Sequence, residues 1–180
     1  MNINRGTSFL LAVLITTVLL ISMVLPVSAK ATRIQVNSFE YDCGNGFEKD
    51  WIEGQVYHIR NYMHTNRNVS DFPELNGINY TVGDGDFNLL TGATAIRGTL
   101  SFKPDTIDGT WEGTWTFNSN AGITRGYAVA HGTGDLFGKT LFLNLYDTES
   151  TPLDDEMCEG LGVWEGNMIA EGYILDTSTP

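Results

Sequence analysis

Three histidines are the first residues to test for chemistry, because imidazole serves both as a metal ligand and as a proton carrier. They are His58, His64 and His131. His58 and His64 fall in a stretch that alternates like a β-strand, and six residues of strand span about 20 Å. That distance is too long for one metal ion, and zinc would need ligands from elsewhere in the chain. The spacing therefore predicts no metal centre, and polar side chains at the mouth of the fold are expected instead.

Carboxylates are plentiful, since 22 acidic residues stand against 10 basic ones and the net charge is −12. Acidic residues gather in Gly83–Asp86 and in 147–156, and calcium binds through several such oxygen ligands. Neither stretch matches an EF-hand loop, so a solvated acidic surface is expected and calcium stays an alternative. The net charge disfavours nucleic acid and anionic membrane surfaces as partners, because both bind basic proteins.

Aromatic side chains next to a few polar groups are the remaining candidates for a site. Trp111, Trp115 and Phe117 fall on one face of an alternating stretch. No G-x-S-x-G elbow and no phosphate-binding loop accompanies them. The pattern predicts a binding wall rather than a nucleophilic enzyme. The expected ligand-binding residues are Trp111, Trp115, Phe117, Tyr127 and Trp164, with Glu53 and His58 as polar members.

The beginning of the chain has the features of an export signal. Arg5 is the only charged residue ahead of an apolar run over 9–25, and small residues follow that run. This order predicts a cleavable signal peptide over 1–29 and a single mature domain over 30–180. The mature protein is expected to be secreted, into the extracellular space or the periplasm, without stable membrane insertion. An uncleaved anchor remains the alternative, because the run is slightly long for a signal.

Only two cysteines are present, Cys43 and Cys158. Exported proteins meet oxidising conditions, so these two residues are predicted to form a disulfide. The bridge would tie the first part of the domain to the last part. Two separate buried thiols are the alternative.

The elements that position these residues are expected to be strands. Twenty glycines are scattered along the chain and disfavour helices, whereas two-residue alternation recurs. Strands are predicted at 32–40, 51–64, 77–90, 94–103, 109–117, 123–131, 137–146 and 160–175, with two arms as an alternative for 77–90 and two arms expected for 160–175. Short strands separated by turns predict an all-β antiparallel domain. Because glycines and bulges allow the bends that closure requires, a single eight-stranded barrel is favoured over a β-sandwich, which stays open as the alternative.

The stretches Gly109–Phe117 and Gly126–Lys139, with their Gly132-Thr133-Gly134 hairpin, carry a family resemblance. Together they resemble the small eight-stranded barrels related to allene oxide cyclase and the dirigent proteins, including poorly characterised bacterial members. The resemblance implies a closed barrel, often oligomeric, whose central cavity holds an apolar or phenolic ligand in some members. No catalytic residue carries over to this chain.

These observations leave three hypotheses for function. The first is a secreted barrel that binds a small apolar or phenolic ligand in its interior. The second is a cyclase or isomerase acting on a lipid-derived or phenolic substrate there, with Glu53, His58 or Glu112 as the buried polar group. The third is a filled barrel that works through its surface as a structural or interaction protein, forming homo-oligomers. The sequence does not decide whether the protein is an enzyme.

Overall fold

The computed structural model describes residues 31–120, 123–148, 158 and 167–177. The predicted signal peptide and Trp164 lie outside these residues. Within them the fold is all-β, and no helix is long and apolar enough to cross a membrane. The strands are β1 (Thr32–Gly46), β2 (Lys49–Glu53), β3 (Val56–Val69), β4 (Gly77–Asn88), β5 (Thr94–Pro104), β6 (Trp111–Asn120), β7 (Ile123–Gly132), β8 (Lys139–Thr148) and β9 (Asn167–Asp176).

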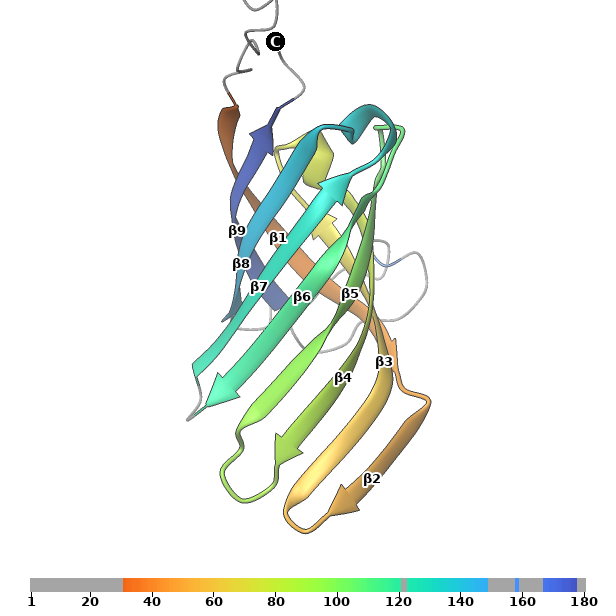
Figure 1. The fold of residues 1–180 in the computed structure, drawn as a ribbon, viewed down its shortest axis with the longest axis vertical. Coiled ribbons are helices and arrows are strands. Elements are labelled where there is room, and N and C mark those ends of the chain that lie inside the picture. The colour runs from red at the N-terminus through yellow and green to blue at the C-terminus, as the bar shows by residue number, and fades with distance from the viewer. Residues whose placement is uncertain (1–30, 121–122, 149–157, 159–166, 178–180) are drawn as a thin grey trace, which may run out of the picture. The chain divides into compact units, whose positions relative to one another are not determined.

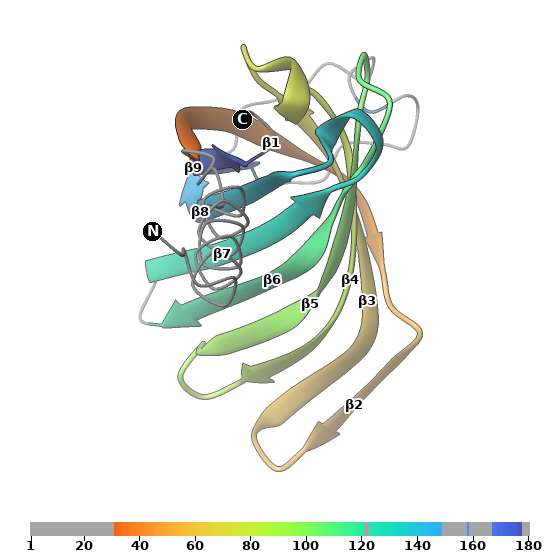
Figure 2. The same cartoon turned by 45° about the horizontal axis from the view of Figure 1, so that its top comes forward.

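The sheet closes into the predicted barrel (Figures 1 and 2). Antiparallel pairing runs from β1 through β9, β8, β7, β6, β5 and β4 to β3, and β3 pairs back with β1. Eight strands therefore form a ring, which confirms the barrel and excludes the sandwich. β2 is a ninth strand outside the ring, and it pairs with the first part of β3 only.

The predicted strand over 51–64 is wrong, because the chain turns back within it. Gly54 has a φ of +61°, and this left-handed conformation joins β2 to β3 in a hairpin. Further along β3, the pairing with β4 slips at a bulge containing Asn61, whose φ is +50°. A bulge inserts one residue and reverses which side chains face inward. His58 and His64, expected on one face, consequently lie on opposite faces of the barrel wall.

Two single-turn 3₁₀ helices, η1 (Pro73–Leu75) and η2 (Gly134–Leu136), accompany one end of the barrel core. Trp111, Leu75 and Leu136 are completely buried and fill the interior there. The indole Nε1 of Trp111 donates a hydrogen bond to the carbonyl of Glu74 at 2.9 Å. This apolar packing fills the interior around Trp111, and Leu75 also borders the cavity described below.

The Gly132-Thr133-Gly134 stretch lies in the hairpin that connects β7 to β8. Gly134 and Gly138 have φ values of +56° and +84°, which only glycine adopts readily. Gly132 is the last residue of β7 and does not have a positive φ. Glycine is required there for space, because a Cβ atom would lie 2.1 Å from the carbonyl oxygen of Leu136.

The predicted disulfide is confirmed. Cys43 on β1 and Cys158, which lies between β8 and β9 in the chain, form a bond of 2.05 Å, and both residues are buried. The bridge joins positions 115 residues apart in the sequence. In the chain-entropy model, closing a loop of that length stabilises the fold by about 5 kcal/mol.

Candidate ligand cavity

A cavity of about 190 Å³ lies inside the barrel. Strands β5 to β9 provide one wall, which is apolar because every second residue on each strand points inward. Trp115 anchors this wall, and its indole Nε1 donates to the carbonyl of Thr99 at 3.1 Å. The side chains of the apolar wall are those of Ile96, Leu100, Phe102, Trp115, Phe117, Ala128, Leu141, Leu143, Leu145 and Met168.

The opposite wall is polar and comes from β1, β3 and β4. In the pairing of β1 with β3, Glu40 lies opposite Asn68 and Asp42 lies opposite Asn66. In the pairing of β3 with β4, Asn66 lies opposite Asn79. Directly paired side chains lie about 5 Å apart, so the polar groups form one continuous surface. We call this surface the polar wall, and its members are Glu40, Asp42, Tyr62, His64, Asn66, Asn68, Asn79 and Thr81.

Asp42 and His64 form a close pair on the polar wall. Nε2 of His64 lies 2.7 Å from Oδ2 of Asp42, within ion-pair distance but without the alignment of a hydrogen bond. The other carboxylate oxygen of Asp42 accepts a hydrogen bond from the backbone N–H of Gly44 at 3.0 Å. Tyr62 stacks beside His64, and burial together with the charge of Asp42 raises the pKa of its hydroxyl. Both oxygens of Asp42 are therefore engaged.

Glu40 is the second carboxylate of the polar wall, and only 4% of its surface is exposed. The amide Nδ2 of Asn68 donates to its Oε1 at 3.2 Å and contacts the hydroxyl of Ser38 at 3.4 Å. Burial raises the pKa of Glu40 to about 7, against the lowering effects of the Asn68 hydrogen bond and the charge of His64. Glu40 can therefore exchange a proton near neutral pH.

Two buried oxygens of the polar wall have no partner. They are the amide oxygens of Asn68 and Asn79, and both residues are less than a tenth exposed. A buried polar atom without a hydrogen bond is destabilising by about 1–3 kcal/mol, so such atoms are rare and usually have a reason. Both atoms belong to side chains that line the cavity. Both oxygens therefore have unused acceptor capacity at the cavity.

The structure places the predicted aromatic residues in different locations. Trp115 and Phe117 line the cavity as expected, whereas Trp111 lies beyond it in the packed end of the barrel. Tyr127 is 53% exposed on the outer face of β7. This placement corrects its expected position, because the glycine and alanines that alternate with it are the residues facing inward. Trp164 lies outside the described residues.

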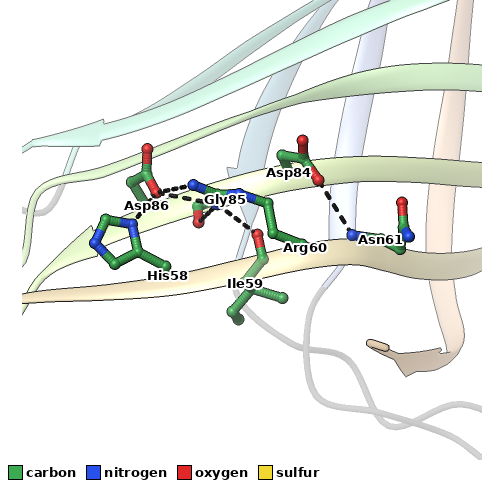
Figure 3. A network of polar contacts seen from close by, with 7 residues as sticks. All are labelled: His58, Ile59, Arg60, Asn61, Asp84, Gly85 and Asp86. Atoms are coloured by element: carbon green, nitrogen blue, oxygen red, sulfur yellow. Dashed lines mark hydrogen bonds and ion pairs between the residues drawn. The ribbon is translucent and has the colours of Figure 1, made fainter. Parts of the chain in front are cut away.

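The predicted polar members of the site do not reach the cavity. Glu53 is exposed at the end of β2, and Glu112 is exposed on β6, where it accepts a hydrogen bond from Ser101 at 2.8 Å. His58 belongs to a separate network on the outside of β3 and β4 (Figure 3). There Nδ1 of His58 lies 2.6 Å from Oδ1 of Asp86. The bulge in β3 explains this, because it sends His64 inward in place of His58.

The network in Figure 3 also includes Arg60, which donates to Oδ1 of Asp86 at 3.1 Å. The hydrogen bonds and charges of His58 and Arg60 lower the pKa of Asp86. Asp84 accepts a hydrogen bond from the backbone N–H of Asn61 at 3.1 Å and so holds the bulge. Asp84 and Asp86, weighed as calcium ligands, thus take part in these contacts, whereas 149–156 of the other acidic stretch lie outside the described residues. Among the described residues, no three His, Cys, Asp or Glu side chains are grouped as metal ligands.

Sequence reasoning missed the polar wall, although the sequence contains a signal for it. Ser38, Glu40 and Asp42 alternate with Phe39 and Tyr41, and β3 shows a similar polar alternation after its bulge. In water-soluble strands the apolar side of such an alternation is expected to face the core. Here β1 does the reverse, and the rings of Phe39 and Tyr41 contact each other at 4.7 Å on the other face.

Fold and site together define a closed antiparallel β-barrel with an amphipathic interior cavity. Comparison of the chain with models of protein families, with curated proteins and with solved structures finds no match. The relationship to allene oxide cyclase and dirigent-type barrels accordingly stays a prediction. What the protein does has to be argued from the cavity itself.

Proposed function

We propose that this protein is a secreted binding protein that holds a small, largely apolar molecule inside its barrel. The observation that carries the proposal is the cavity of about 190 Å³ with one apolar and one polar wall. An apolar cavity of about 150 Å³ accommodates benzene, whereas drug-sized ligands occupy roughly 300–1,000 Å³. The ligand is therefore a single ring with a short substituent, such as a phenol, or a short alkyl chain.

Two further observations support this proposal. The Cys43–Cys158 disulfide is typical of proteins that work in an oxidising compartment, which fits export. The unpartnered oxygens of Asn68 and Asn79 inside the cavity fit a ligand that carries a polar group. An apolar body and a polar group would then lie against the two walls that match them.

Native mass spectrometry of the mature protein, purified without detergent, tests the proposal. We expect a discrete additional mass that organic solvent releases, or that appears when phenol or a short alcohol is added. Ala128→Leu should abolish the added mass, because Ala128 lines the cavity and a larger side chain would fill it. Leu100→Phe offers a second way to fill the cavity if the first variant does not fold. Retention of the same mass by a folded cavity-filled variant would contradict interior binding.

A second candidate function is supported by Glu40. A buried carboxyl with a pKa of about 7 can act as a general base or acid at neutral pH. In an isomerase, ionised Glu40 would take a proton from the carbon between a ketone and a double bond. The electrons would shift into a dienolate, and the same proton would return to the far end of the former double bond. Tyr62 and His64 on the same wall could stabilise the enolate oxygen.

The isomerase function is tested with cyclohex-3-en-1-one, whose conjugated product has a strong far-ultraviolet band that the substrate lacks. Glu40→Gln should remove the activity, and Glu112→Gln, which makes the same charge change on the outer face, should keep it. Equal isomerisation rates for the wild-type protein and Glu40→Gln would contradict the isomerase function. The proposed binding function would be unaffected.

A further inference from the structure

The polar wall has an unusual charge balance for an interior surface. It contains the carboxylates of Glu40 and Asp42 and one histidine, His64. Among the described residues that line the cavity there is no lysine or arginine. A ligand carboxylate would therefore enter beside two acidic groups with only His64 to compensate its charge. The cavity consequently disfavours fatty acids and other anionic ligands.

The two carboxylates differ in how far their oxygens are engaged. Both carboxylate oxygens of Asp42 have a partner: Oδ1 accepts from the backbone N–H of Gly44, and Oδ2 lies at ion-pair distance from His64. Glu40 accepts one hydrogen bond, from Nδ2 of Asn68 to its Oε1, and its Oε2 accepts none from the described residues. The same contact fixes the amide of Asn68, so that its oxygen is the atom left over. Glu40 is thus the carboxylate with room for a further partner.

Three open acceptors lie close together on the polar wall. Glu40 pairs directly with Asn68 across β1 and β3. On β4, Asn79 is two residues along from the residue that pairs with Asn68. Asn79 therefore lies diagonally across from Asn68, roughly 7 Å from it and on the same face of the sheet. A protonated amino group has three N–H donors and one positive charge. It matches the three acceptors in number and compensates the carboxylate in charge.

We propose that the ligand is a small primary amine, with its apolar body against β5–β9 and its ammonium group bound by Glu40, Asn68 and Asn79. This inference rests on the proposed binding function and specifies its ligand class. A hydroxyl group supplies a single donor and no charge. Matched amines and alcohols of the same shape therefore separate the inference from the broader function.

The experiment is isothermal titration calorimetry of the mature protein at pH 6 and pH 8 with two matched pairs. The pairs are benzylamine with benzyl alcohol, and hexylamine with hexan-1-ol. At pH 8 the amines should bind at least tenfold more tightly than the alcohols. At pH 6 their affinity should fall about tenfold, because Glu40 must release a proton to bind an ammonium group.

The other titratable groups on the polar wall are Asp42, Tyr62 and His64, so a variant is needed to assign the pH effect. Glu40→Gln should lower the affinity for the amines to that for the alcohols and remove the proton release, measured in buffers of different ionisation enthalpy. Glu112→Gln should bind both classes as the wild-type protein does. Asn79→Ala should weaken amine binding severalfold without loss of folding, because it also removes a buried unpartnered oxygen.

The outcomes separate the two proposals. Alcohols that bind as tightly as their amines at pH 8, or amine binding that Glu40→Gln leaves unchanged, would overturn the amine inference and leave interior binding intact. If no member of either pair binds, the proposed binding function itself is overturned. Tighter amine binding that depends on Glu40 supports both.

Discussion

Replacing Glu40 by glutamine should stabilise the protein, and the gain should depend on pH. Glutamine has nearly the same shape and keeps an oxygen for the Asn68 amide, but it carries no charge. The pKa of Glu40 rises from 4.5 to about 7 on folding because the carboxyl is buried. The folded protein therefore holds a proton that the unfolded chain releases between these two pH values.

The sign and size of the effect follow from that shift. Below pH 4.5 the carboxyl is protonated in both states, so wild type and Glu40→Gln should be about equally stable. As the pH rises toward 7, the wild-type protein alone loses stability, because a buried carboxyl must stay protonated or become charged without water. A shift of this size corresponds to roughly 3 kcal/mol. Above pH 7 the advantage of the variant should stay constant.

Urea unfolding at pH 4.5, 6 and 8 with the disulfide intact measures this difference. The groups that surround Glu40 are the same in both proteins, so their contributions largely cancel from the comparison. Glu112→Gln, an exposed site with the same change in net charge, should differ little from wild type at any of these values. An advantage of Glu40→Gln that did not change between pH 4.5 and pH 8 would refute the assigned burial of Glu40.

Three other changes test the fold and the outer network. Removing the disulfide with Cys43→Ala and Cys158→Ala should lower the free energy of unfolding by up to about 5 kcal/mol, measured by denaturant titration; an unchanged midpoint would contradict its role. Gly98→Ala should be destabilising by about 3 kcal/mol or more, because its Cβ would lie 1.9 Å from a β4 carbonyl. Gly46→Ala, with only a 3.9 Å contact, is the control, and equal thermal melting points would refute the crowding argument. Asp86→Asn should change stability at pH 7 by less than about 1 kcal/mol. It should also reduce the loss of stability on acidification, since the pKa of Asp86 is lowered in the folded state, and it should leave ligand binding intact.

Much of the architecture was predictable because it depends on local periodicity. Alternation located most of the strands, and the inward face of β6 was assigned correctly for Trp115 and Phe117. The export context predicted the disulfide between the only two cysteines. These inferences need no knowledge of which strand pairs with which.

The polar wall depends on pairing and could not be located in the same way. Alternation shows that a strand has two faces, but closure of the ring decides which one is interior. For Tyr127 the bulky face is outside, because Ala128 and Gly126 leave space for side chains from across the barrel. For His64 a one-residue bulge, held by Asp84 from a neighbouring strand, changed the face. Both choices depend on what the neighbouring strands contribute as well as on the strand itself.

The pairing of β1 with β9 gives the ring a particular order of assembly. Most neighbouring strands in the ring also follow each other along the chain, so they can pair as soon as both have emerged. β1 and β9 are the first and last strands of the described residues, and Thr32 lies opposite Asp176. The ring therefore cannot close until β9 arrives, and the cavity inside it is incomplete until then. For a chain that crosses a membrane as an extended thread, this delay postpones maturation until translocation has delivered the last strand. Under the proposed export and binding function, ligand capture would then be confined to the destination compartment.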